Sequence, residues 1–180
     1  MKHLKTLAKC SVVVIAGIIL ANYPDEIRTG EVGLLVIGNA EDCYREPYKC
    51  PADVWTDGIG NTNDVVLGRK LSDEEIAERW KDNIKIAENC VNRWANGKGL
   101  PQGAFEAAVS ITFNAGCSKL KQATLFKYAR AGDINLMCSQ FPRWVYSQGK
   151  VLPGLVKRRN VEKALCLGLI KSPEQLSAYR

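Results

Sequence analysis

The sequence predicts a mainly helical α+β domain with a small β-hairpin region, preceded by an N-terminal apolar helix. Three observations support this fold class. Residues 72–94 carry apolar side chains at helical spacing, and the chain beyond residue 100 repeats that pattern with only short breaks. Residues 41–68, in contrast, are rich in proline, glycine, aromatic residues and threonine, which is typical of turns and short strands. A length of 180 residues fits one domain of ordinary size.

The N-terminus has the pattern of an export segment. Three lysines lie within the first nine residues, an apolar run follows from Cys10 to Ala21, and no acidic residue occurs before residue 23. An apolar run of this length is more typical of a signal segment than of a full membrane span. Cleavage near Ala21 would release a secreted protein, but the residues there match a cleavage site poorly. We therefore expect a retained signal anchor in residues 1–26 and a separate domain in residues 27–180.

The charge pattern restricts the possible partners only weakly. The formal net charge is +6, and without the three leader lysines 22 basic residues stand against 19 acidic ones, or +3. A mildly basic body suits an anionic polymer, but it is equally consistent with simple solubility. The sequence contains no glycine-rich phosphate loop. We expect no nucleic-acid partner.

The expected helices follow from start and stop signals along the chain. Ser72 and Glu75 form a capping box before the longest periodic segment, which Gly97 closes. Asp133 is expected to cap a further helix, and Pro142 to end it. The expected helical ranges are 30–40, 72–97, 101–116, 122–131, 134–140 and 154–168, with a partly ordered cap formed by residues 172–180.

The stretch from residue 41 to 62 holds the candidate chemistry. Glu41 directly follows an apolar segment, and eight and then five residues separate Glu41, Cys50 and Thr56. A turn through Pro47 and Pro51 could fold these three side chains around one small volume. Such a volume suits a water molecule and a glycosidic oxygen. A glutamate at this place is, however, most often a solvated residue at a helix end.

This pattern resembles the catalytic signature of the phage-type lysozymes, glycoside hydrolase family 24, which cut the glycan of bacterial cell walls. The segments 58–62, 112–116 and 154–162 resemble further motifs of the same family, in family order, so the resemblance covers roughly residues 30–168. It implies two lobes: a small β-hairpin lobe and a helical lobe, joined by the long helix, with the substrate in the cleft between them.

The resemblance also implies roles for individual residues. Glycoside hydrolysis needs a protonated acid and a second group that activates water or attacks the sugar. Glu41 corresponds to the acid, and Cys50 stands where most members have aspartate. Thr56 corresponds to a residue that holds the attacking water, although a strand threonine is the plain alternative. Phe113 resembles a cleft-wall residue and could equally be a core aromatic. No metal and no cofactor are expected.

Cys50 raises the possibility of a switch, because a disulfide would remove its thiolate from the site. Some endolysins of the family carry a signal-anchor-release (SAR) segment, and those that this chain resembles have three cysteines at the places of Cys10, Cys43 and Cys50. The resemblance implies a closed Cys43–Cys50 bond in the tethered protein. Release would expose Cys10, which would bond to Cys43 and liberate Cys50. The alternative is that Cys43–Cys50 is a plain structural disulfide and Cys10 is idle.

Seven cysteines in a chain of this length indicate an oxidising compartment. Four of them lie downstream and allow three pairings. Cys138 and Cys166 lie on the last two helical segments, which should pack together, so we expect that pair and, by remainder, Cys90 with Cys117.

Other enzyme classes fit poorly. A cysteine protease needs a histidine partner, and the only histidine is His3 in the leader. A zinc site formed by cysteines alone is also not supported, because the sequence has no Cys-x-x-Cys pair.

The resemblance implies a monomeric endolysin that uses the Sec export machinery and is held in the host inner membrane. After release, aided by a holin or pinholin, it would act on peptidoglycan in the periplasm. A non-catalytic wall-binding module on the same fold and a conventionally secreted lysozyme with a cleaved leader stay open.

Overall fold

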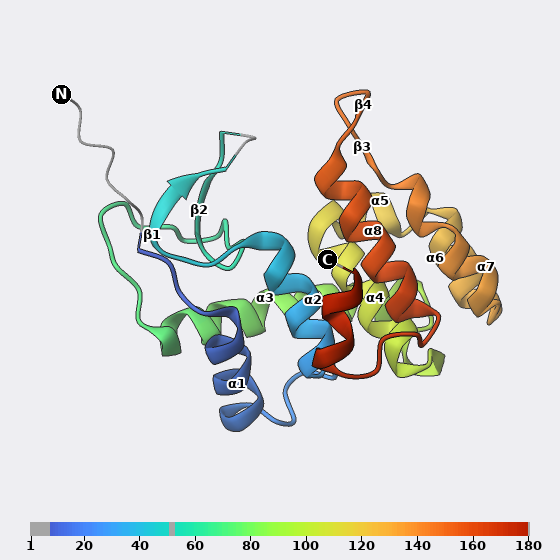
Figure 1. The fold of residues 1–180 in the computed structure, drawn as a ribbon, viewed down its shortest axis with the longest axis horizontal. Helices are drawn as coiled ribbons and strands as arrows, with labels where there is room; N and C mark the ends of the chain where they lie inside the picture. Colours follow the sequence, from blue (N-terminus) through green and yellow to red (C-terminus); the bar gives the residue numbers. More distant parts are fainter. Residues whose placement is uncertain (1–7, 51–52, 180) are drawn as a thin grey trace.

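The computed structural model describes residues 8–50 and 53–179, so the first seven residues of the expected leader and Pro51 of the expected turn lie outside the described residues. The chain is mainly helical, with two small antiparallel sheets (Figure 1). The α-helices are α1 (Val12–Asn22), α2 (Glu31–Glu41), α3 (Asp73–Trp94), α4 (Gln102–Ala115), α5 (Cys117–Leu120), α6 (Thr124–Ala131), α7 (Ile134–Ser139) and α8 (Pro153–Cys166). Short 3-10 helices are η1 (Gly97–Gly99), η2 (Phe141–Arg143) and η3 (Pro173–Tyr179), and the strands are β1 (Tyr44–Lys49), β2 (Trp55–Gly58), β3 (Tyr146–Ser147) and β4 (Lys150–Val151).

The molecule has two lobes, as the sequence predicts. The β1–β2 hairpin lies at one end, most of the helices at the other, and α3 runs from below the hairpin toward the helical lobe (Figure 1). β1 and β2 pair antiparallel with Tyr48 opposite Thr56. The capping box of Ser72 and Glu75 is present at the start of α3, where each residue's side chain accepts from the other's backbone N–H. Trp80 of α3 is fully buried between the neighbouring helices.

The helical lobe is built around α4. Every residue from Ala104 to Thr112 is buried, because α4 packs against α8, α3 and α2 on different sides. The sequence did not predict the β3–β4 hairpin, which projects from this lobe (Figure 1). Its turn uses Gln148 and Gly149, both at positive φ.

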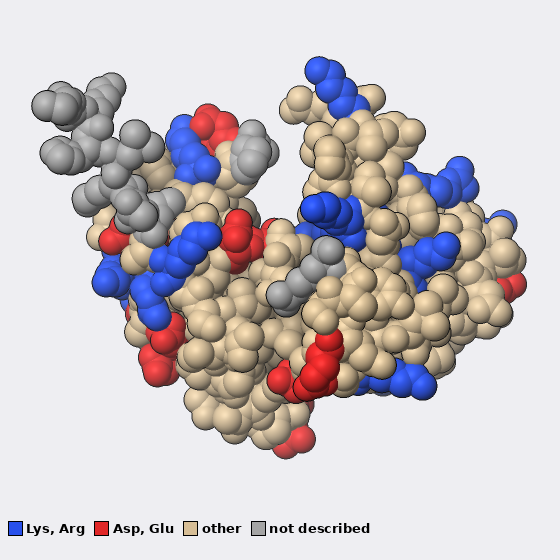
Figure 2. Space-filling view, viewed as in Figure 1, with Lys and Arg blue, Asp and Glu red and all other residues tan. Residues whose placement is uncertain are grey.

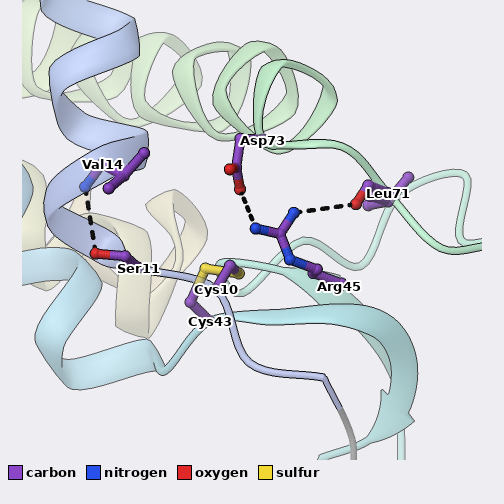
Figure 3. The surroundings of a disulfide bond; sticks show 7 residues. All are labelled: Cys10, Ser11, Val14, Cys43, Arg45, Leu71 and Asp73. Atoms are coloured by element: carbon purple, nitrogen blue, oxygen red, sulfur yellow. Dashed lines mark hydrogen bonds and ion pairs between the residues drawn. A yellow bond between two sulfur atoms is a disulfide. The ribbon is translucent and has the colours of Figure 1, made fainter.

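Helix α1 packs against α2 and α3 as part of the core. Ser11 caps it by accepting from the backbone N–H of Val14 (Figure 3), and Ile15 and Ile19 are fully buried. Gly38 of α2 makes the close approach possible, since a Cβ there would lie 2.4 Å from Val12. No helix among the described residues has both the length and the apolar character that a membrane span requires.

A buried carboxylate pair fixes the start of α2. Glu88 of α3 accepts from the backbone N–H groups of Arg28 and Thr29 at 2.9 and 2.6 Å. Glu106 of α4 accepts from the N–H of Gly30 at 2.9 Å, and burial raises the pKa of Glu106. These contacts satisfy donors ahead of α2 and hold the helix in one position against α3 and α4.

Candidate active site

Glu41 is the last residue of α2, where the sequence places the candidate acid. Asp42 follows at φ 60°, so the chain leaves the helix sharply and enters β1. The Glu41 side chain is 21% exposed, and its Oε1 lies 2.5 Å from Nη1 of Arg158 on α8. The carboxylate therefore stands at the junction of the two lobes with a cation at hydrogen-bond distance.

Arg158 connects Glu41 to a buried network in the helical lobe. Its Nε donates to Glu162 at 3.0 Å and its Nη2 to the Ser110 carbonyl at 3.2 Å. Burial alone would lower the pKa of Arg158, but the charges of Glu162 and Glu41 outweigh it, so the pKa is raised and the guanidinium stays charged. Glu162, which is fully buried, also pairs with Arg159. The network gives the Glu41 side chain a fixed, charged support.

Gly60 brings the loop after β2 directly against the acid. A Cβ on Gly60 would lie 3.1 Å from Cε1 of Phe113 and 3.3 Å from Oε2 of Glu41. Gly60 also has a φ of +66°, a conformation that other residues rarely adopt. The loop thus packs against Glu41 and Phe113 through a bare backbone.

We expect Gly60→Ala to lower activity by about tenfold, because the new methyl group would push Phe113 and Glu41 by a fraction of an ångström, and a displacement of about 1 Å at a catalytic group can cost about a hundredfold. Gly68→Ala is the matched control: Gly68 has a φ of +79°, but nothing lies within 4 Å of the position that the new methyl group would take. Both variants should lose about 1 kcal/mol of unfolding free energy from backbone strain. Thermal melts and wall-lysis rates of the two proteins would check this, and equal activity in both would contradict it.

Cys50 faces a cavity between the lobes. The cavity has a volume of about 1060 Å³, and Cys50 lies on its sheet side, opposite Asn114, Trp144 and Tyr146 of the helical lobe. Figure 2 shows this face of the molecule hollowed between the two lobes. Among the described residues that line it, the charged ones are all basic: Lys119, Arg143 and Arg159. The cavity is therefore suited to an anionic ligand.

A second cavity of about 710 Å³ adjoins the first on the Glu41 side. The two share Asn114, Leu152 and Leu155 as lining residues, so they are neighbours on either side of these residues. Glu41 and Arg158 line the second cavity. The candidate acid and the candidate thiol thus line two adjoining cavities.

Tyr48 on β1 is a further group at this site. Burial, together with the negative charges of Glu41, Asp42, Tyr44 and Cys50, raises its pKa to about 12. The phenol therefore keeps its proton at physiological pH and can act as an O–H donor. The sequence offered no signal for this residue beyond its place on the predicted hairpin.

Thr56 and Phe113, the other two candidate site residues, lie outside the linings of the two cavities within the described part of the chain. Thr56 is 3% exposed, and its hydroxyl donates to the Val54 carbonyl at 3.2 Å. Phe113 is half-buried and lies against Gly60, next to Glu41. The expected roles of Thr56 and Phe113 stay predictions.

The structure contains a disulfide between Cys10 and Cys43 (Figure 3). Residues 8–10 run beside β1, with the N–H of Arg45 donating to the Ala8 carbonyl and that of Cys10 to the Cys43 carbonyl. Arg45 also pairs with Asp73 at the start of α3. Since Cys43 is bonded to Cys10, it is not bonded to Cys50. This is the arrangement that the resemblance implies for a released protein.

The other two disulfides, Cys90–Cys117 and Cys138–Cys166, are the pairs that the sequence predicts. The first links α3 to α5, and the second links α7 to α8. Both lie in the helical lobe and away from Glu41, as bonds that stabilise a scaffold do. Among residues 8–50 and 53–179, no cluster of three or more His, Cys, Asp or Glu side chains could hold a metal ion.

The family model described as phage lysozyme matches residues 38–162. The chain belongs to the phage lysozyme family. This lysozyme is 43% identical to a SAR-endolysin of Escherichia phage P1, and the match covers 91% of this chain and 94% of the relative. It is 44% identical to a SAR-endolysin of Haemophilus phage HP1, covering 74% of this chain and 77% of that one.

Solved structures agree with this assignment. The crystal structure of the active form of P1 phage endolysin Lyz matches with a TM-score of 0.85 at 42% identity, covering 92% of this lysozyme and 98% of that chain. The secreted inactive form of the same endolysin gives a TM-score of 0.57 at 44% identity, covering 80% and 99%. The fold of this lysozyme is thus more similar to the active form than to the inactive one.

Arg158 is the main residue beside Glu41 that the sequence did not identify. Within α8 it belongs to an ion-pair network with Arg159 and Glu162. Arg158 extends this network to Glu41, 117 residues earlier in the chain. The adjacent arginines and the glutamate four residues after the first are a visible signal of a buried network. They do not indicate which carboxylate the network reaches.

Proposed function

We propose that this phage lysozyme is an endolysin that hydrolyses the β-1,4 bonds between N-acetylmuramic acid and N-acetylglucosamine in bacterial peptidoglycan, for host lysis. The observation that carries the proposal is Glu41, which lines a cavity next to the one beside Cys50 and has its carboxylate against Arg158. Membership of the phage lysozyme family supports the same reaction.

In this proposal Glu41, when protonated, donates its proton to the glycosidic oxygen and so allows the leaving sugar to depart. Cys50, as a thiolate, acts on the other sugar by activating a water molecule or by attacking the anomeric carbon. Arg158 holds the Glu41 carboxyl group toward the cleft. The packing of α2 and α8 fixes Glu41 and Arg158 relative to each other.

Peptidoglycan suits the cleft in charge as well as in shape. The cavity beside Cys50 presents Lys119, Arg143 and Arg159. The stem peptides of the wall polymer carry carboxylates, so its approach is favoured by these basic side chains. The printed names of the relatives, which include endolysins, agree with a cell-wall substrate.

We infer that the activity is controlled by thiol–disulfide exchange. In the tethered protein a Cys43–Cys50 bond blocks the catalytic thiol. After release the Cys10 thiolate attacks Cys43, the Cys43–Cys50 bond breaks, and Cys50 departs as a thiolate with no net oxidation or reduction. Support comes from the Cys10–Cys43 bond of this structure, together with its similarity to the active form of the P1 endolysin.

The proposed location follows from the same scheme. Residues 1–26 direct export through the Sec machinery and anchor the protein in the inner membrane, and release delivers a monomer into the periplasm, with a holin or pinholin as the trigger. Retention of the leader is favoured over cleavage by the packing of α1, since Ile15 and Ile19 are fully buried against the domain. Cleavage near Ala21 would leave that helix linked covalently to the domain only through the Cys10–Cys43 disulfide.

Glu41→Gln tests the catalytic assignment, because an amide cannot donate the proton that the leaving oxygen needs. We expect wall lysis to be lost while the protein still binds purified walls. Glu31→Gln is the matched control, because Glu31 is exposed at the opposite end of the same helix. Turbidity of a wall suspension measures lysis, and a pull-down measures binding. Lysis by Glu41→Gln would refute the assignment, and absence of lysis by the unchanged, reduced protein would favour a wall-binding module.

A further inference from the structure

The cavity beside Glu41 has a wall that comes from the very end of the chain. Its volume is about 710 Å³, and α2 and α8 form two of its sides. Leu176 and Tyr179 of η3 line a third. η3 packs on both helices, so that the chain ends beside α2 and α8 (Figure 1). Leu176 is 3% exposed and fixes this tail to the core, while Tyr179 is half-buried.

The two cavities of the cleft differ in which catalytic candidate they contain. Among the described residues, Cys50 lines the larger cavity and Glu41 does not, whereas Glu41 lines the smaller one and Cys50 does not. They meet at Asn114, Leu152 and Leu155. A glycan that runs through the cleft therefore passes from the thiol to the acid.

This separation gives the direction of the substrate. The acid protonates the glycosidic oxygen, and that oxygen departs with the sugar on the reducing side of the broken bond. The group that attacks or activates water acts on the anomeric carbon of the sugar on the other side. The cavity that contains Glu41 thus receives the leaving portion of the glycan, and the cavity that contains Cys50 receives the portion that is attacked.

The lining of the smaller cavity suits an acetylated sugar. Val36, Leu152, Val161 and Tyr179 supply apolar surface, with Asn39 and Lys157 as polar groups. A pyranose ring presents an apolar face to an aromatic ring, and the methyl of an N-acetyl group fits an apolar pocket.

We propose that the C-terminal tail forms the wall of the leaving-group subsite and that Tyr179 contacts the sugar bound there. The inference rests on the proposed function, since it takes Glu41 as the acid. It adds a binding role for η3, which the sequence suggested only as a partly ordered cap.

Tyr179→Leu tests the proposal, because leucine keeps apolar packing on the core but removes the ring. The probe is a peptide-free oligomer of alternating N-acetylglucosamine and N-acetylmuramic acid, of one length and reduced at its end. We expect KM to rise about fivefold, as the loss of one aromatic contact allows. The cleavage pattern should stay the same, because every productive register places a sugar next to the acid.

Tyr128→Leu is the matched control, since Tyr128 is a half-buried tyrosine of α6 that packs on the core and is not among the described residues that line either cavity. It should keep the wild-type KM, and Tyr179→Phe should keep it too. An unchanged KM in Tyr179→Leu would overturn the subsite and leave the lysozyme assignment intact. Lysis by Glu41→Gln would instead overturn the proposed function. Should Tyr179→Leu fail to fold in a thermal melt, Tyr179→Met repeats the test with a longer apolar side chain.

Discussion

Full-length protein in which Cys10 is replaced by serine is expected to reach the periplasm and stay inactive. Without the Cys10 thiolate nothing displaces Cys50 from Cys43, so the catalytic thiol remains in its disulfide. Lysis should be at least about a hundredfold below wild type, since the site lacks one of its two reacting groups. Dithiothreitol should restore activity by reducing the blocking bond. The measurement is lysis of purified walls by released protein, whose intact mass shows whether residues 1–26 are retained.

The double variant Cys10→Ser/Cys43→Ser is the control, because it removes both sulfurs that take part in the exchange with Cys50. It should be active with or without reductant, although less stable, since the link between residues 8–10 and β1 is lost. Activity of the oxidised Cys10→Ser protein equal to that of wild type would rule out the exchange. The lysozyme assignment would survive that result, and the role of the leader would be reduced to export and packing of α1.

The long helix α3 was predictable because its signals are local. The apolar spacing and the capping box at Ser72 lie within one segment, and the structure forms the helix from Asp73 to Trp94. Its end differs from the expected closure at Gly97, because Ala95 is the C-cap and Asn96 has the left-handed conformation. Local signals also predict α2, which ends at Glu41 as expected. The place of Glu41 at the end of a helix can therefore be predicted from neighbouring residues alone.

The β3–β4 hairpin was missed because its strands have only two residues each. Alternation of apolar and polar side chains cannot be detected over so short a length. The sequence carried one local signal, Gly149. Both turn residues, Gln148 and Gly149, adopt positive φ, and glycine is the usual residue in that conformation. Tyr146, next to this turn, consequently reaches the cleft from an element that the sequence did not suggest.

The support of Glu41 was not predictable because it depends on packing between α2 and α8. Arg158 and Glu41 meet only when both helices are placed against α4. The same is true of Tyr179, whose approach to the cleft depends on how the tail folds over α8. Sequence patterns identify which residues are suited to a buried network, whereas their partners follow from the tertiary structure.

Replacement of Arg158 by methionine is expected to damage both stability and activity. Methionine fills similar space but leaves Glu162 with only part of its charge compensation and Glu41 with none from α8. Breaking a buried ion pair by removing one partner costs about 3–5 kcal/mol. For a chain of this size that lowers the melting temperature by about 10 °C. Lysis should fall by about tenfold or more even well below the melting temperature, because the Glu41 carboxyl group is no longer held.

Two companion variants separate the causes. Lys163→Met changes a half-buried cation on the same helix and should behave like wild type in both measurements. Arg158→Lys keeps the positive charge, but one ammonium cannot hold Glu41, Glu162 and the Ser110 carbonyl in the geometry of a guanidinium. It should therefore recover much of the stability and little of the activity. If Arg158→Lys restored activity fully, charge alone would suffice at Glu41, and the positioning role of the guanidinium would be wrong.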